Sequence, residues 1–146
     1  MYIVTALGAG GERSGCLIGF ATQCSIRPPR FLACVSKQNR TFDVVRGADA
    51  VVVHFMGRAQ HALAELFGGE TGDEVDKFEL CEWSEGPRGI PVLAGVPGWF
   101  CGRVLERLEL GDHLGLLVEA VAAEDRGGDL DLRFQSVKPI EPGHPA

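Results

Sequence analysis

Short apolar runs, separated by turn-forming residues, follow one another along the whole chain. Most are rich in β-branched or aromatic side chains and have glycine or proline close to one end, which is typical of β-strands. We expect strands at residues 2–7, 15–25, 30–36, 50–56, 90–93, 99–110, 113–124 and 130–137. The leucines of residues 101–110 also fit a helical period, but the pairing of this run with the next one across Gly111-Asp112 favours a β-hairpin.

Two short helices are expected between these strands. The first begins at Asn39 or Thr41, either of which can cap a helix, and stops at Gly47. The second spans residues 58–67, whose apolar side chains fall close to one helical face, and two glycines follow it. The acidic and polar residues 70–77 then predict an exposed loop.

The number of strands relative to helices decides the expected fold class. About seven or eight short strands with turn signals favour a mainly β fold, a Greek-key split β-barrel with two short helices, over a βαβ fold. The sequence contains no internal repeat and no composition shift that marks a boundary. We therefore expect residues 1–146 to form a single domain.

Composition narrows the range of partners. The 146 residues carry a formal net charge of −6, which argues against nucleic acid and against an anionic membrane, because both attract concentrated Lys and Arg. No apolar run is long enough to span a bilayer, and the first residues lack the basic and apolar regions of a signal peptide. We therefore expect a cytoplasmic protein.

The cysteines and histidines do not predict a metal site. The cysteines are odd in number and include no CxxC pair, so we expect reduced thiols that pack as small apolar groups. The histidines are scattered without the spacing of zinc ligands. The two sets are Cys16, Cys24, Cys34, Cys81 and Cys101, and His54, His61, His113 and His144.

A polar segment closes the second apolar run. Residues 22–25 supply a hydroxyl, an amide and two small side chains just before Pro28-Pro29, which forces an extended exit of the chain. Such a strand end can present backbone N–H and C=O groups to a flat heteroaromatic ligand. It can equally be an ordinary strand terminus, and the chemistry alone favours neither interpretation.

A second polar segment, residues 36–41, precedes the first expected helix. Its backbone N–H groups, with Lys37 or Arg40 adding charge, are suited to bind a phosphate group. The alternative is a solvated loop with an N-cap. A third feature, Gly111-Asp112-His113, places a histidine at a strand start, where it either orients a nicotinamide cofactor or is simply a surface turn residue.

These segments occur in an order that resembles a known family. Together with Val4-Thr5, Leu66-Phe67, Lys77-Phe78 and residues 91–93, they make the chain similar to the flavin reductase-like, FMN-binding split-barrel family over nearly its whole length. Each motif is weak alone, whereas their order and spacing together are fairly specific.

The resemblance implies a homodimer with FMN, or alternatively FAD, near the interface, and NADH or NADPH as the hydride donor. It also implies a partner monooxygenase that receives reduced flavin. His113 is the implied catalytic residue, positioning the nicotinamide. The implied cofactor-binding residues are Gly19, Thr22, Gln23, Cys24 and Ser25 in the first segment, and Ser36, Lys37, Gln38, Asn39 and Thr41 in the second.

One departure from the family pattern keeps other functions open. The family commonly has polar residues where this chain has Leu17, Ile18, Gly19 and Phe20, and apolar side chains there would weaken contacts with the ribityl chain. The leading hypothesis is a flavin-dependent NAD(P)H oxidoreductase. The alternatives are a non-catalytic flavin-binding or carrier protein, and a barrel that uses another flat cofactor such as deazaflavin or haem.

Overall fold

The computed structural model describes residues 1–128, 139–141 and 143. Strands predominate, and short 3-10 turns lie at Arg58–Gln60, Lys77–Glu79 and Pro87–Gly89. The elements are β1 (Tyr2–Leu7), β2 (Arg13–Ile18), β3 (Ala21–Ser25), β4 (Arg30–Ser36), α1 (Thr41–Val45), β5 (Ala50–Phe55), α2 (His61–Gly69), β6 (Trp83–Glu85), β7 (Pro91–Leu93), β8 (Gly98–Glu109) and β9 (His113–Asp125). The strand expected at residues 130–137 lies outside the described residues.

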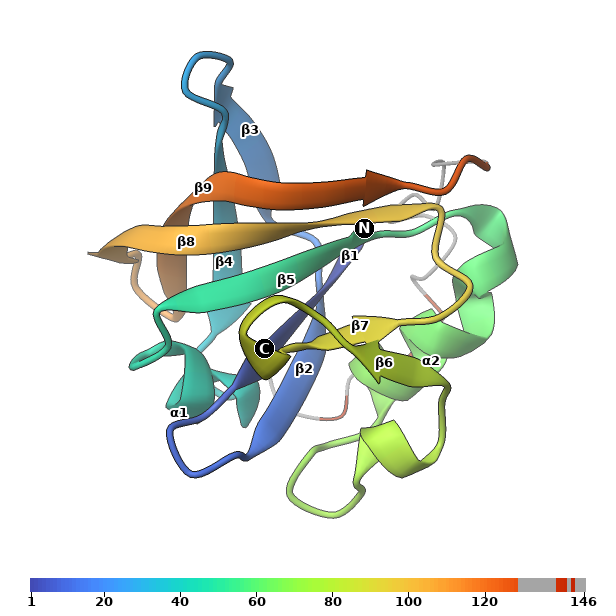
Figure 1. The fold of residues 1–146 in the computed structure, drawn as a ribbon. Helices are drawn as coiled ribbons and strands as arrows, with labels where there is room; N and C mark the ends of the chain where they lie inside the picture. The colour runs from blue at the N-terminus through green and yellow to red at the C-terminus, as the bar shows by residue number, and fades with distance from the viewer. Residues whose placement is uncertain (129–138, 142, 144–146) are drawn as a thin grey trace.

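Seven of the strands form one curled antiparallel sheet in the order β2-β1-β5-β8-β9-β4-β3. The two edge strands, β2 and β3, are consecutive in sequence and are joined only by Gly19 and Phe20. Because so short a link keeps the end of β2 next to the start of β3, the sheet curls into a barrel, which stays split since β2 and β3 do not pair with each other (Figure 1). The expected fold class, a mainly β split barrel with two short helices, is confirmed.

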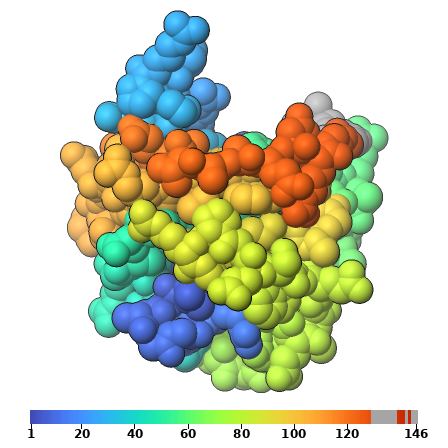
Figure 2. All heavy atoms as spheres, viewed as in Figure 1, coloured from blue at the N-terminus to red at the C-terminus, as the bar shows by residue number. Residues whose placement is uncertain are grey.

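The prediction of one continuous strand over residues 15–25 is wrong. The run is two strands: β2 pairs with β1 and β3 pairs with β4. The chain changes partner at Gly19 and Phe20, where the Phe20 carbonyl accepts a hydrogen bond from the Cys34 N–H at 2.9 Å. The apolar pattern did not reveal this break, because residues 16–21 are all apolar apart from Gly19. Beyond it, β3 and the turn that follows project above the body of the molecule (Figure 2).

The expected hairpin of the last two described strands is confirmed. β8 and β9 pair along their length across the turn at Gly111-Asp112, and the turn closes with a hydrogen bond from the Leu110 N–H to the His113 carbonyl at 3.0 Å. The helical alternative for residues 101–110 is therefore excluded.

The two helices cover the sheet near β1 and β2. α1 begins at Thr41, whose N–H donates to the Asn39 side chain at 3.0 Å. α2 begins at His61, three residues later than expected, because Arg58–Gln60 form a 3-10 turn. It packs closely against β2: a Cβ at Gly15 would lie 2.8 Å from the Phe67 ring, so only glycine fits there.

The loop expected at residues 70–77 is not exposed at its end. Lys77 is only 4% exposed, and its ammonium group donates to the carbonyls of Phe67 at 3.1 Å and Gly15 at 3.4 Å. The expectation of a fully exposed segment is wrong at this residue. The charge pattern of the segment did not predict the burial of Lys77, since a lysine among acidic residues is usually exposed to solvent.

Two further findings concern the described residues only. None of their helices is long and apolar enough to cross a membrane. No cluster of three or more His, Cys, Asp or Glu side chains among them is arranged to hold a metal ion. The five cysteines are free: two are buried, two are half-buried and Cys24 is exposed.

Candidate functional site

Three of the expected site residues lie on one face of the sheet. In β3 and β4, Thr22 pairs with Leu32, and at the other end of β4 Ser36 pairs with His113 of β9. Paired residues and residues an even number of positions apart share a face, so Thr22, Ser36 and His113 share one. The residues between them on β4, such as Ala33 and Val35, are fully buried in the core. We call the opposite side of β3, β4 and β9 the outer face.

The first polar segment forms the free edge of the sheet. Thr22, Gln23 and Cys24 are exposed and Ser25 is half-buried. β3 is the last strand in the sheet order, so no strand covers its backbone groups on the side away from β4. The carbonyls of Gln23 and Ser25 accept hydrogen bonds from the exposed side chains of Thr22 and Gln23. Gly19, also exposed, lies just before this edge.

His113 is held by two neighbours. Its Nδ1 lies 2.7 Å from a carboxylate oxygen of Asp112, and the hydrogen bond with His113 keeps the pKa of Asp112 below its ordinary value. An ionised Asp112 can only accept, so His113 donates from Nδ1 and Nε2 carries the lone pair. The ring of Phe20 lies against the imidazole, with 5.1 Å between ring centroids.

Lys37 joins the second polar segment to the histidine turn. Its backbone N–H donates to the Asp112 carbonyl at 2.9 Å, and its ammonium group forms an ion pair with Glu109 at 2.6 Å. The Lys37 side chain is 31% exposed and that of Glu109 is 74% exposed. A ligand phosphate would therefore compete with a solvent-accessible carboxylate for this cation.

The rest of the second segment turns away from the outer face. The Gln38 N–H lies 3.3 Å from the Ser36 hydroxyl, and Asn39 caps the Thr41 N–H. Thr41 is 1% exposed, and its hydroxyl lies 3.0 Å from that of Ser14. The structure thus brings Ser36 to the outer face and places Lys37 at the end of β4 beside the histidine turn, whereas the Thr41 side chain is committed to the interior.

The chain matches one family of known proteins. Residues 1–138 match the family model described as the flavin reductase like domain. The chain belongs to the flavin reductase-like family.

Curated relatives in this family carry several functional names. The chain is 32% identical over 126 residues to the FMN reductase (NADH) of Ancylobacter novellus, covering 86% of this chain and 68% of that protein. It is 29% identical to the 4-hydroxyphenylacetate 3-monooxygenase reductase component of Pseudomonas aeruginosa, covering 80% and 70%. For two Rhizobium meliloti relatives, a probable flavin reductase and the stachydrine N-demethylase reductase subunit, the chain spans 39% and 53% of their lengths.

Solved structures of the flavin reductase-like family agree with the fold. A flavin reductase domain protein from Arthrobacter sp. FB24 matches with a TM-score of 0.78 at 26% identity, covering 88% of this chain and 77% of that one. The NADH:FAD oxidoreductase of Streptomyces globisporus matches with a TM-score of 0.77 at 26% identity, covering 85% and 73%.

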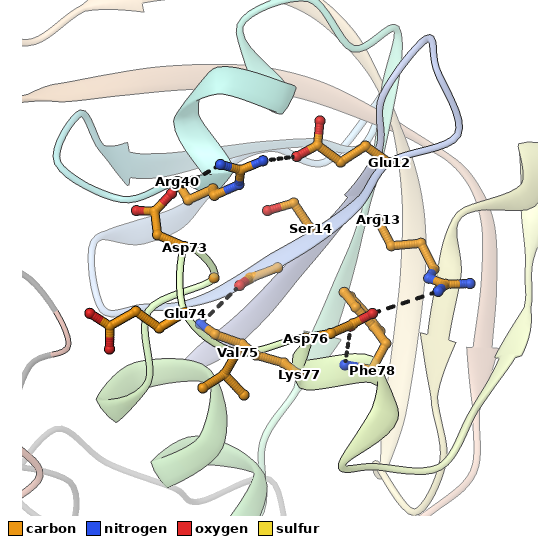
Figure 3. Close-up of a pocket in the computed structure, with 12 residues that line it drawn as sticks. Glu12, Arg13, Ser14, Arg40, Asp73, Glu74, Val75, Asp76, Lys77 and Phe78 are labelled. Carbon is orange, nitrogen blue, oxygen red and sulfur yellow. Dashed lines mark hydrogen bonds and ion pairs between the residues drawn. The ribbon is translucent and has the colours of Figure 1, made fainter.

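Arg40, the other cation of the second polar segment, faces a separate cavity of about 260 Å³. Figure 3 shows its guanidinium group between Glu12 and Asp73, and the ion pair with Asp73 measures 3.0 Å. Nearby, Arg13 lies 3.8 Å from Asp76. Two carboxylates engage Arg40 and a third engages Arg13, whereas Lys37 has one, highly exposed, carboxylate partner. This cavity is therefore a poorer phosphate site for a flavin reductase-like chain than the region around Lys37.

The sequence did not predict that Phe20 contacts His113. Its position suggested only an apolar departure from the family pattern, yet the ring is 67% exposed and contacts His113. By contrast, Ile18 is buried in the main core and Leu17 packs beside Gly68. The available signal was the alternation of β3, which places Phe20 opposite to the core-facing Ala21.

Proposed function

We propose that the chain is a flavin reductase domain that holds FMN on the outer face and passes a hydride to it from NADH or NADPH. The observation that carries the proposal is the convergence of Thr22, Ser36 and His113 on one face of three neighbouring strands. FAD is the alternative flavin. Bound flavin supplies the redox chemistry, and the protein supplies binding and orientation.

The free edge of β3 fits a flat heteroaromatic ring. Thr22, Gln23 and Cys24 leave their strand edge accessible, and backbone N–H and C=O groups can pair with the polar atoms at the rim of an isoalloxazine ring. Gly19 and Ser25 flank this edge and allow the ring to approach the backbone. We assign the ring contacts to these five residues.

The ribityl chain and phosphate are assigned to the start of the second polar segment. Ser36 offers a hydroxyl and Lys37 a cation that lies on a solvent-accessible ion pair, so exchange of Glu109 for phosphate costs little. Gln38 and Asn39 lie next in the same turn. Thr41 is left out of direct contact because its hydroxyl is buried against Ser14.

His113 is assigned the orientation of the nicotinamide. Asp112 fixes the proton on Nδ1, which leaves Nε2 to bond to the carboxamide of the reductant. Correct placement of two rings accounts for much of the rate in such transfers, because the reacting atoms must lie about 3–3.5 Å apart.

The structure weakens the support for a non-catalytic carrier. That alternative depended on the apolar side chains from Leu17 to Phe20, but Ile18 is buried in the core and Leu17 packs beside α2, which leaves Phe20 as the one large apolar side chain of this segment on the outer face. Rapid mixing with NADH and NADPH separates the two functions, since a carrier would show no rapid loss of flavin absorbance.

We further propose a homodimer with flavin at the interface. The free edge of β3, together with exposed Ile26 and Val121, supports a second copy seated beside it, because open strand edges and apolar side chains favour association. A mass near twice 15.7 kDa in sedimentation would support this. The relatives named as monooxygenase reductase components support a partner monooxygenase as the acceptor of reduced flavin.

The decisive experiment combines flavin binding with nucleotide oxidation. The protein is titrated with FMN, and oxidation of NADH and NADPH is then followed in His113→Ala, Lys37→Ala and the control Arg46→Ala, which removes an exposed cation. We expect His113→Ala to reduce nucleotide oxidation and Lys37→Ala to weaken FMN binding, with no effect from the control. Unchanged behaviour in both site variants would refute the site, and preferential binding of deazaflavin or haem would refute the flavin assignment.

A further inference from the structure

Phe20 is a large aromatic side chain that the fold leaves in solvent beside the proposed site. Ala21 packs against the main core, so the neighbouring Phe20 points to the outer face. Its ring is 67% exposed. The backbone of Phe20, in contrast, is held in place, because its carbonyl accepts a hydrogen bond from the Cys34 N–H.

The exposed ring is in contact with one side chain that the proposed chemistry requires. The centroids of the Phe20 and His113 rings lie 5.1 Å apart and the ring planes are tilted by 52°. Aromatic rings attract each other at this separation. Asp112 holds His113 at Nδ1, so the imidazole is fixed at one ring atom by the carboxylate and along one side by Phe20.

Two restraints define an orientation better than one. The Asp112 side chain is 74% exposed, and a single hydrogen bond to an exposed carboxylate leaves the imidazole free to rotate about that bond. A ring anchored through its backbone to β4 removes that freedom. Without it, Nε2 would spend less time in the direction that meets a nicotinamide.

We propose that Phe20 is a positioning residue for hydride transfer, which holds the His113 imidazole in the orientation that receives the nicotinamide nucleotide. This inference rests on the proposed function. It gives a role in the reaction to a residue whose apolar side chain stood out in the sequence only as a departure from the family pattern. Phe20 acts through His113, so its effect is expected on the nucleotide and not on flavin affinity.

The test compares Phe20→Leu, which keeps an apolar side chain without the ring, with Phe20→Tyr, which keeps the ring. For Phe20→Leu we expect the KM for the nucleotide to rise about 2- to 10-fold, the effect of losing one aromatic pair. We expect FMN affinity to stay unchanged and Phe20→Tyr to behave as the wild type. Leu80→Ala is the control, since Leu80 is exposed to nearly the same extent, at 63%, in a different part of the chain.

A second measurement needs no activity. The His113 ring protons lie under the Phe20 ring current, so their NMR signals, assigned by their loss in His113→Gln, should move in Phe20→Leu and stay in place in Phe20→Tyr. The role given to Phe20 would be overturned if Phe20→Leu left the KM for the nucleotide unchanged, or if it weakened FMN binding without raising that KM. Failure of the wild type to reduce FMN would instead refute the proposed function itself.

Discussion

The backbone N–H of Leu93 donates a hydrogen bond to Nε2 of His54 at 3.0 Å. On the other side of the ring, Nδ1 lies 3.0 Å from the Ile3 carbonyl. The imidazole is fully buried, so it must be neutral, with its proton on Nδ1 and a lone pair on Nε2. A single side chain therefore connects β1, β5 and β7, and the connection depends on the absence of a second proton.

This relationship predicts that the protein loses stability in mild acid. Burial lowers the pKa of His54 from 6.5 to about 4. As the pH falls from 6.5 towards 4, the unfolded chain takes up a proton that the native chain refuses, so the free energy of unfolding decreases. The full effect of His54 is about 3 kcal/mol, and about 2 kcal/mol of it is lost between about pH 7.5 and pH 5. Urea unfolding at the two pH values measures it.

His54→Gln isolates this contribution from that of the carboxylates. The variant should be less stable at neutral pH by about 1–3 kcal/mol, because a buried hydrogen bond is lost. Its stability should fall less than that of the wild type between the two pH values. His61→Gln changes a histidine whose side chain is 46% exposed and should keep the wild-type pH dependence. An identical pH dependence in His54→Gln would contradict the assignment.

Lys77→Met tests whether the buried ammonium group of Lys77 stabilises the fold. The ammonium group serves the carbonyls of Phe67 and Gly15, and burial lowers the pKa of Lys77. Methionine keeps the length of the side chain but leaves both carbonyls without this donor, so we expect a loss of about 1–3 kcal/mol. Lys37→Met, which removes a more accessible ion pair, should cost less than about 1 kcal/mol. Equal losses in urea unfolding would contradict the structural role of Lys77.

Local patterns predicted most of the strands because each strand buries one or both of its sides along its own length. The three consecutive valines of β5 are fully buried, and apolar runs on both sides of Gly111-Asp112 pair as expected. For these strands and this hairpin, the information lies within a few residues of the feature it predicts. The family resemblance used the order of segments along the whole chain, and two of the residues it named, Ser36 and His113, are paired across β4 and β9.

Features that depend on distant partners could not be found this way. The break at Gly19 exists because β2 and β3 pair with different strands, which no local alternation records. Lys77 is buried because the carbonyls of Gly15 and Phe67 surround it. Thr41 matched the family pattern of ligand-binding residues, yet its hydroxyl faces Ser14, 27 positions away.

Thr41→Val separates a structural hydroxyl from a ligand-binding one. Valine keeps the shape of the side chain and removes the contact with Ser14, so we expect a loss of about 1 kcal/mol in the free energy of unfolding. FMN affinity should be unchanged, whereas Ser36→Ala should weaken it with little loss of stability. Fluorescence titration of FMN against both variants measures this. Weaker FMN binding in Thr41→Val would show that the hydroxyl reaches the ligand after all.

The pairing of Lys37 with Glu109 predicts an effect that depends on the phosphate group alone. Glu109→Gln frees the cation from a 2.6 Å ion pair, so FMN should bind up to about fivefold more tightly, the equivalent of one exposed ion pair. Lys37→Met should weaken FMN binding. Neither change should alter the affinity for riboflavin, which has the same ring and ribityl chain but no phosphate.

Glu106→Gln is the matched control, since Glu106 is an exposed carboxylate on the same strand. It removes the same charge from the protein without releasing Lys37, and should leave FMN affinity close to that of the wild type. If Glu106→Gln tightened FMN binding as much as Glu109→Gln, the gain would come from net charge rather than from Lys37. If riboflavin affinity changed in parallel with FMN affinity, Lys37 would contact the ring or ribityl chain, and the phosphate would have to lie elsewhere on the outer face.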